Sequence, residues 1–187
     1  ECIQSVLDQT ITDFELIISD NGSTDATPAL LAAAAPRLQA AGIEYLTWRN
    51  GENLGCSLAR NQAWERATGE FVLFMDNDTA IRTHDWLAIL QARMLAEPRL
   101  GVLGPKLIYP FLPHPIQCAG VAISRLGRVR FRGRGEPANT PAYQHYEQVS
   151  ALISACWIMR NGLMKEVGGL DPLFHPVQFE DLDFCLR

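Results

Sequence analysis

Residues 71–78 read FVLFMDND, an apolar run that ends in a polar, acidic group. Phe71–Met75 is the most hydrophobic strand that the sequence predicts, and it ends abruptly in Asp76-Asn77-Asp78. Short, continuous apolar runs are typical of strands buried on both faces, as in a parallel sheet. In open parallel sheets, ligands bind outside the carboxyl ends of the strands. The acidic tip at 76–78 is therefore a candidate binding site.

The same pattern occurs upstream, where the apolar run Glu15–Ser19 (ELIIS) leads into Asp20. Around these two strands we expect helices at residues 1–9, 23–41, 57–67 and 84–96, and further strands at 43–48 and 101–108. Ser23 and Thr83 are the expected N-caps of two of these helices. Strands that alternate with helices indicate βαβ units, and hence an α/β fold with a mainly parallel twisted sheet flanked by helices.

The pattern changes after Pro110. We expect a hairpin from strands at 116–124 and 128–132, a loop with Pro and Gly at 133–145, a strand at 151–159 and short helices at 161–167 and from 180 onward. One domain over 1–187 is predicted, with a nucleotide-binding half at 1–110 and a smaller, mixed half at 111–187 for a second substrate. Because both ends of the sequence fall inside predicted helices, we expect a domain truncated at both ends.

Composition narrows the class of protein. The 187 residues are 48% hydrophobic and 20% charged, as in an ordinary globular domain with a real core. A net charge of -5 argues against nucleic acid as a partner, because phosphate backbones recruit basic surfaces. The five cysteines are scattered, without a C-x-x-C pair, so neither a disulfide framework nor a zinc site is expected. No run is long enough to span a membrane, and a reducing, cytoplasmic location is the default expectation.

The two acidic tips suggest a specific chemistry. Carboxylates at the ends of apolar strands cost desolvation energy unless a partner compensates them. A divalent cation with a diphosphate is a natural partner, because Mg²⁺ and Mn²⁺ prefer oxygen ligands. The alternative for any single Asp is that it caps the following turn or helix. Finding D-N-D at the strongest strand, with Asp20 as a second tip, favours the metal and diphosphate.

Three blocks then carry a resemblance to a known family. They are Gln9-Thr10 through SDNGSTD (19–25), NLGCSLARNQAWERATGEFVLFMDND (53–78) and GGLDPLFHPVQFEDLDFCLR (168–187). In this order and spacing the chain resembles the family 2 glycosyltransferases, which have the GT-A (Rossmann-like) fold. The resemblance covers almost the whole chain, and it identifies the chain as a catalytic core fragment.

The resemblance implies roles for the donor-side residues. Asp20 matches the acidic residue that contacts the base or ribose of the nucleotide. Arg60 matches a residue near the nucleotide, where its guanidinium can pair with phosphate. Asp76 matches the first acidic residue of D-x-D, which faces the ribose, with Asn77 beside it in the nucleotide-sugar site. Asp78 matches the last, which binds the Mn²⁺ or Mg²⁺ ion that bridges the diphosphate.

The resemblance also implies the catalytic step. Asp181, in the Glu180-Asp181 pair, matches the general base that deprotonates the acceptor hydroxyl, and Glu180 lies on the acceptor side. Attack from the face opposite the leaving group implies inversion at the anomeric carbon. The alternative interpretation of this pair is an acidic first helical turn that the helix dipole favours. Asp183 fits that reading better, with Arg187 four residues on as its ion-pair partner.

Weaker candidates remain open. Trp157 is placed on the acceptor side, where it can stack on a sugar ring, although a core tryptophan is the alternative. Five arginines gather between Arg125 and Arg134, four of them at alternating spacing that would put them on one face of a strand. They suit an anionic or phospholipid-linked acceptor, or only a solvated hairpin face. The four histidines lack metal-ligand spacing, and only His175 is near enough in sequence to line the acceptor site.

The resemblance implies a UDP- or dTDP-sugar donor, a glycan or lipid-linked acceptor and a setting in cell-envelope or surface-polysaccharide synthesis, in the cytoplasm or at the inner face of the membrane. It also implies a strand ahead of Glu1 that helps to hold the base, and Ala63 replaces a usual glycine. Two alternative functions compete with this one. A sugar-nucleotide nucleotidyltransferase would need a glycine-rich, basic phosphate loop, which the sequence lacks. A non-catalytic binding domain would need neither D-N-D nor Glu180-Asp181.

Overall fold

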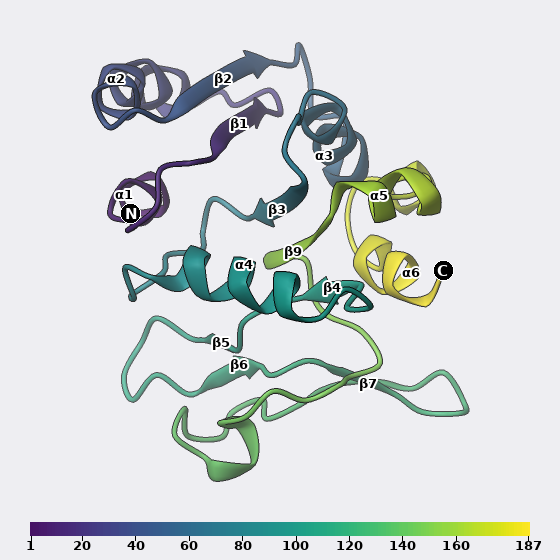
Figure 1. Cartoon of the computed structure of the whole chain (residues 1–187). Helices are drawn as coiled ribbons and strands as arrows, with labels where there is room; N and C mark the ends of the chain where they lie inside the picture. Colours follow the sequence, from purple (N-terminus) through teal and green to yellow (C-terminus); the bar gives the residue numbers. More distant parts are fainter.

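The computed structural model describes all residues, 1–187, and has an α/β architecture (Figure 1). The α-helices are α1 Cys2–Leu7, α2 Thr27–Ala40, α3 Cys56–Trp64, α4 Trp86–Ala96, α5 Asn161–Val167 and α6 Glu180–Leu186. The strands are β1 Glu15–Asp20, β2 Glu44–Arg49, β3 Phe71–Met75, β4 Val102–Leu103, β5 Leu107–Ile108, β6 Ile116–Cys118, β7 Val121–Ile123, β8 Val129–Phe131 and β9 Cys156–Arg160. Two short 3₁₀ turns cover Pro141–Tyr143 and Pro172–Phe174.

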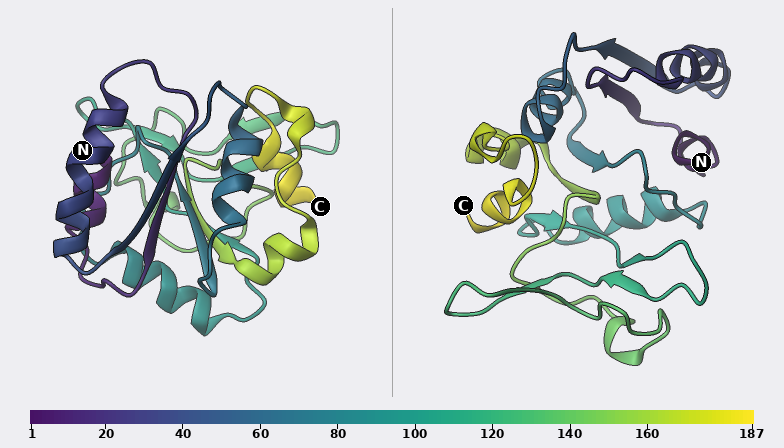
Figure 2. Two further views of the ribbon diagram at one scale, coloured as in Figure 1. Left: turned by 90° about the horizontal axis from the view of Figure 1, so that it is seen from above. Right: turned by 180° about the vertical axis from the view of Figure 1, so that it is seen from behind.

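The central strands form two sheets. β1 pairs in parallel with β2 over their full length, from Glu15↔Glu44 to Asp20↔Arg49. β3, β9 and β4 form the second sheet, with β9 in the middle and antiparallel to both neighbours. Parallel pairing was predicted for most of the sheet, and the antiparallel β9 is the exception. It enters between β3 and β4 only after the chain has passed through the mixed second half, so it approaches from the opposite direction (Figure 2).

A large groove lies between β1 and β3. β1 bonds to β2 and β3 bonds to β9, and no ladder joins β1 to β3. The groove has a volume of about 1760 Å³ and is lined by apolar residues of both strands, by α1 and α2 on one side, and by α3 and α4 on the other. Its lining reaches Asp20 and Asp76 at the carboxyl ends of the two strands. The groove therefore runs along two strand edges and ends at the predicted donor tips.

The main core lies on both faces of the β3–β9 pair. On one face, Trp157 and Met159 of β9 pack with Val72 and Phe74 of β3 and with buried residues of α5 and α6. On the other face, a cluster of five buried residues is built from α4 and β9. Both predicted halves of the chain thus contribute to one core, because β3 comes from the first half and β9 from the second.

Several predicted boundaries were wrong for local reasons. Ser23 does not cap α2, which begins at Thr27; the Ser23 amide instead donates to Asp20 Oδ1 in a turn. Thr83 does not cap α4, which begins at Trp86. The strand predicted at 101–108 is split into β4 and β5, and the intervening residues include Gly104-Pro105. Proline has no amide hydrogen for a ladder, which explains the break.

The hairpin prediction was correct only in part. β7 and β8 pair as an antiparallel hairpin, but residues 116–118 form a separate strand, β6, that pairs with β5. The backbone turns at Gly120, whose φ is 90°, and a Cβ there would lie 2.6 Å from Val149 Cγ1. A residue other than glycine would be strained at this position, so the single strand expected over 116–124 becomes two.

Candidate functional site

Asp20 ends β1 and is buried. Its Oδ1 accepts a hydrogen bond from the Ser23 amide at 2.8 Å, while Oδ2 lies 3.5 Å from Arg49 Nε and has no hydrogen-bond partner. One oxygen therefore shapes the turn after β1, as the capping alternative expected. The other is a buried acceptor without a hydrogen-bond partner, and the Arg49 guanidinium beside it compensates part of its charge.

A network of amide side chains holds the loops next to Asp20. Asn21 donates to Asn53 Oδ1 at 2.8 Å and to the Gly55 carbonyl at 3.2 Å. Its own Oδ1 accepts from the Leu54 amide at 3.0 Å and from Asn50 Nδ2 at 3.2 Å. These contacts join the loop after β1 to the loop before α3. No role was predicted for Asn21, although its place inside the SDNGSTD block was the available signal.

The Asp76-Asn77-Asp78 tip follows β3 and faces outward. The Asp76 amide donates to the Ala155 carbonyl at 2.9 Å, which fixes the start of the tip against β9. Asn77 and Asp78 are both exposed, and neither side chain has a hydrogen bond or ion pair within the protein. The Asp78 carboxylate is thus free to bind a ligand from solution.

Arg60, on α3, lies at the centre of the site. Its guanidinium forms an ion pair with Asp76 Oδ1, donates to Ser154 Oγ at 2.5 Å and lies 3.5 Å from Glu180 Oε1. The side chain is largely buried, so these charge-assisted contacts act in a medium of low polarity. Arg60 therefore joins the tip of β3, the segment before β9 and the start of α6.

Glu180 and Asp181 begin α6 on the other side of Arg60. Glu180 is only 3% exposed, and its Oε2 has no hydrogen-bond partner. Asp181 Oδ2 accepts from the Ser154 amide at 3.1 Å, and Oδ1 accepts from the Leu182 amide at 2.8 Å. The two residues before α6, Gln178 and Phe179, have φ of 90° and 72°, which is costly for residues other than glycine. Backbone strain of this kind is concentrated at functional sites.

The pKa of Asp181 lies above that of an ordinary carboxyl. Burial raises its pKa, and the nearby Glu180 carboxylate raises it further, while the amides of Ser154 and Leu182 act in the opposite direction. A raised pKa makes a carboxylate a better proton acceptor near neutral pH. Each carboxylate oxygen accepts more than one hydrogen bond, so the two backbone contacts leave room for an acceptor hydroxyl.

Two further residues of the site had no assigned role in the sequence analysis. Ser154 is buried and contacts Arg60 through its hydroxyl and Asp181 through its amide. Asn61 binds Leu170 twice, from Nδ2 to the carbonyl at 2.7 Å and from the amide to Oδ1 at 2.9 Å. It thereby ties the ARN block to the GGLD block. The signal for Ser154 was a polar residue within an otherwise apolar run.

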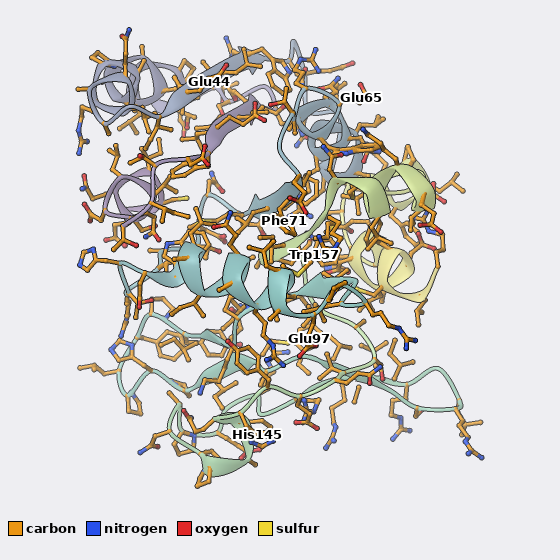
Figure 3. All side chains as sticks on the ribbon, viewed as in Figure 1. Glu44, Glu65, Phe71, Glu97, His145 and Trp157 are labelled. Atoms are coloured by element: carbon orange, nitrogen blue, oxygen red, sulfur yellow. The ribbon has the colours of Figure 1, made fainter.

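Trp157 was placed on the acceptor side, and this prediction was wrong. Its side chain is 0% exposed on β9, inside the main core, with its ring centroid 5.6 Å from that of Phe184 (Figure 3). A ring that is closed off from solvent cannot stack on a sugar. The alternation along β9 points it inward, where its large apolar surface contributes to packing.

His175 and Cys56 lie close to the site but have no evident reactive role. His175 Nδ1 is 3.2 Å from the Leu54 carbonyl, in the segment that leads to α6. Burial raises the pKa of the Cys56 thiol to about 12, and Glu180 acts in the same direction. The thiol is therefore protonated at neutral pH and is not a nucleophile. Asp183 pairs with Arg187 at 2.8 Å, as predicted for a residue of the first helical turn.

The arginines predicted to lie on one face of a strand, between Arg128 and Arg134, do not share one face. Only Arg130 of the four alternating residues lies inside β8, which is three residues long. Arg132 forms an ion pair with Glu147 and donates to the Ala119 carbonyl at 3.1 Å. Arg128 lies in the turn before β8, and Arg134 lies in the turn after it, above the Phe131 ring. The cluster is thus divided: Arg132 is ion-paired after β8, whereas the arginines at the tip of the hairpin, Arg125, Arg128 and Arg130, have no ion-pair partner.

The residues around the tip of β3 fit a divalent ion only in company with a ligand. No three His, Cys, Asp or Glu side chains converge to form a complete metal site. Mg²⁺ is commonly held by one or two carboxylates together with substrate phosphates and water. The free, exposed Asp78 carboxylate suits that arrangement. No helix of the chain is long and apolar enough to cross a membrane.

The sequence matches a family model described as "Glycosyl transferase family 2" over residues 1–117. Two similar proteins are the O-antigen biosynthesis protein RfbC of Myxococcus xanthus and the putative teichuronic acid biosynthesis glycosyltransferase TuaG of Bacillus subtilis strain 168. RfbC is 32% identical over 194 residues, covering 99% of this chain and 14% of RfbC. TuaG is 40% identical over 78 residues, covering 42% of this chain and 29% of TuaG. The chain spans less than a third of the length of either relative.

Solved structures confirm the fold. Residues 1–349 of S. aureus TarS in complex with UDP superpose with a TM-score of 0.70 at 23% identity, covering 99% of this chain and 49% of that one. The mannosyltransferase PcManGT from Pyrobaculum calidifontis, in complex with GDP-Man and Mn²⁺, gives 0.70 at 18% identity, covering 97% and 45%. Both are GT-A proteins, as the sequence predicted. With the family model matching more than half of its residues, the chain belongs to glycosyl transferase family 2.

Proposed function

We propose that this chain is the core of a metal-dependent, inverting glycosyltransferase that moves a sugar from a nucleoside-diphosphate sugar to an acceptor hydroxyl. The observation that carries the proposal is the arrangement around Arg60. This residue joins the donor-side Asp76 to the acceptor-side Glu180, and Asp181 follows directly in the chain. A scaffold needs no such buried charge network, because a buried charge costs energy unless it is paired.

In the proposed reaction, the chain's own residues have separate tasks. Asp20 and Asn77 contact the nucleotide sugar at the ends of β1 and β3, and Arg60 holds Asp76 in place beside them. Asp181 accepts the proton of the acceptor hydroxyl as the new bond between that oxygen and the anomeric carbon forms. The bond between the anomeric carbon and the diphosphate oxygen breaks on the opposite face, which inverts the configuration.

Asp78 would hold the divalent ion. A Mn²⁺ or Mg²⁺ ion bound there would offset the negative charge that develops on the departing nucleoside diphosphate. The Mn²⁺ present in the PcManGT complex supports this part of the proposal. Glu180 is proposed for the acceptor side because it directly precedes Asp181 and pairs with Arg60, while its own Oε2 is enclosed and has no hydrogen-bond partner.

The names of the relatives suggest a setting. We propose a role in cell-envelope or surface-polysaccharide synthesis, with a glycan or lipid-linked acceptor, because RfbC and TuaG bear names from O-antigen and teichuronic acid synthesis. UDP- or dTDP-sugars are the proposed donors. The cytoplasm or the inner face of the membrane is the proposed location, where nucleotide sugars meet such acceptors.

Residues 1–187 are proposed to belong to one domain, with a donor half at 1–110 and an acceptor half at 111–187. The groove between β1 and β3 supports this. It has the two free strand edges and the apolar lining that an additional strand would need, in the position of the strand expected ahead of Glu1. Amide hydrogen exchange tests it: β1 and β3 should exchange faster in the 187-residue chain than in a longer natural polypeptide that includes this strand.

The donor site is tested by calorimetric titration of UDP, GDP and dTDP into the protein, with and without Mn²⁺. We expect one nucleotide to bind in a metal-dependent way, and we expect Asp78→Ala to abolish that dependence. Asp13→Ala is the matched control, because Asp13 is also an exposed aspartate but precedes β1, at the opposite end of that strand from Asp20. Failure of all three nucleotides to bind, in this chain and in one with the preceding strand, would favour the non-catalytic binding domain.

A further inference from the structure

The β7–β8 hairpin carries an apolar row out of the core and into solvent. Val121 faces Phe131 at the base of the hairpin, and Ile123 faces Val129 nearer the tip. At the base, Val121 is buried against Leu182 of α6, with Ile123 and Phe131 packed alongside. Toward the tip the same row loses its neighbours, and Val129 is 37% exposed.

An exposed leucine lies at the end of this row. Leu126 is 96% exposed, the highest value among the large hydrophobic residues, and residues 124–130 are all exposed. The turn is well ordered: the Ser124 amide donates to the Arg128 carbonyl at 3.0 Å, and the Gly127 amide donates to the Ser124 carbonyl at 2.9 Å. The hairpin projects from the body of the domain in both views (Figures 1 and 2). A fixed turn thus presents Leu126 to solvent.

The leucine is surrounded by unpaired positive charge. Arg125, Arg128 and Arg130 have no carboxylate within 4.0 Å. No Asp or Glu occurs between Glu97 and Glu136, although the chain as a whole has a net charge of -5. The tip is therefore a local basic region on an acidic protein, with an apolar residue at its apex.

We propose that this tip docks the protein on an anionic lipid bilayer. In this arrangement Leu126 enters the interfacial region and the three arginines pair with headgroup phosphates. A soluble anion does not account for the tip, because it would bind in a concave, hydrogen-bonding site and would gain nothing from an exposed leucine. The inner end of the hairpin packs on Leu182, the residue after Asp181, so the hairpin that docks is joined directly to the helix that carries the proposed general base.

The test is co-sedimentation of the 187-residue chain with vesicles of phosphatidylcholine, with and without phosphatidylglycerol. We expect binding only to the anionic vesicles and weaker binding as salt increases. Arg125→Gln, Arg128→Gln and Arg130→Gln should each lower the partition coefficient by about fivefold, and Leu126→Ser should lower the binding that persists at high salt. Circular dichroism checks that the variants stay folded.

The matched control is the triple variant Arg82→Gln, Arg99→Gln and Lys165→Gln, which changes the net charge equally at exposed sites elsewhere. Equal loss of binding in this control and in a variant that combines Arg125→Gln, Arg128→Gln and Arg130→Gln would overturn the proposal, as would equal binding to both kinds of vesicle. Competition by free glycerol phosphate at millimolar concentration would also overturn it and indicate a soluble anion site. None of these outcomes depends on glycosyl transfer, so failure here leaves the proposed function standing.

Discussion

Two acidic groups of similar sequence lie on opposite sides of Arg60, and their surroundings differ. After β3, Asn77 and Asp78 are exposed to solvent, and the Asp78 carboxylate forms no hydrogen bond or ion pair within the protein. Glu180-Asp181, at the start of α6, is enclosed; Glu180 is almost fully buried, and burial raises the pKa of Asp181. The same residue type is therefore placed in water at one position and partly removed from water at the other.

This difference separates two chemical tasks. A carboxylate that binds a hydrated ion and a diphosphate must be accessible and ionised. A carboxylate that takes a proton works best when its pKa approaches the working pH, and desolvation has that effect. Arg60 contacts both groups and compensates part of the buried charge. Asp78 and Asp181 can thus be assigned to different steps from their surroundings alone.

The largest expected effect comes from removing the proposed base. Asp181→Asn should lower the turnover number by about 10²–10⁴-fold, because a positioned general base contributes that much. Binding of the nucleoside diphosphate with Mn²⁺ should change little, since Asp181 lies on the other side of Arg60 from the tip of β3. Release of nucleoside diphosphate from the donor measures the first quantity, and calorimetry measures the second.

Asp183→Asn is the control for this change. It removes a carboxylate from the same helical turn, but one that pairs only with Arg187. Turnover should then stay close to that of the unmodified protein. If both variants lost activity equally, the acidic first turn of α6 would be serving the helix dipole and not the chemistry.

The second effect concerns the residue that connects the two groups. Arg60→Met leaves the buried Glu180 without its cation, and breaking a buried ion pair in this way costs about 3–5 kcal/mol of unfolding free energy. Urea denaturation followed by circular dichroism measures it. Adding Glu180→Gln to Arg60→Met should recover part of the loss, because the buried charge is then also removed.

A comparison pair is available on the surface. Arg93 forms an i, i+4 ion pair with Glu97 on α4 and lies over the Tyr146 ring, so Arg93→Met should cost about 0.3–0.5 kcal/mol for the ion pair and about 0.5–1 kcal/mol for the cation–π contact. A cost for Arg60→Met no greater than for Arg93→Met would mean that Glu180 is less enclosed than its contacts indicate. The contrast between the two acidic groups would then be lost.

The third effect tests the exposed group. Asp78→Ala should weaken Mn²⁺-dependent binding of the nucleotide by at least about 10–100-fold, the range that losing an outer-shell partner already costs at metal sites. Binding without metal should be unchanged, because Asp78 has no other contact within the protein. Calorimetry at several Mn²⁺ concentrations separates the two. A loss that is independent of metal would assign Asp78 to the nucleotide itself.

The sequence predicted the local structure before Asp76 better than the surroundings of Asp181, for a physical reason. The predicted strand Phe71–Met75 matches β3 residue for residue, and its polar tip follows directly in the chain. Such a site can be predicted from neighbouring residues alone, because the apolar run and the carboxylates after it are adjacent in the sequence. The partners of Arg60 lie far away in the sequence, at Ser154 and Glu180, and only the tertiary fold brings them together.

The wrong predictions share that cause. Trp157 was assigned by residue type, but the pairing of β9 between β3 and β4 puts it in the core. Ser23 was assigned to a helix that begins four residues later, because the Asp20 side chain holds the Ser23 amide in a turn. The antiparallel direction of β9 depends on the path of the whole second half. Periodicity and local caps contain no information on such long-range contacts.

The smallest expected effect is on stability as a function of pH. The pKa of Asp181 is raised in the folded state above its ordinary value of about 3.9, which applies to the unfolded chain. At pH values between the unfolded and the folded pKa, the folded state therefore holds more protons than the unfolded state. Unfolding free energy from this group therefore decreases as pH rises through that window, by at most about 1.4 kcal/mol for each unit of pKa and less where solvent screens the charge. Asp181→Asn lacks this pH-dependent contribution, so the unfolding free energy of the variant relative to that of the unmodified protein should increase from about pH 4 to neutrality. Urea midpoints measured across this range test it, and a difference that is constant with pH would mean that Asp181 is no less hydrated than an exposed carboxylate.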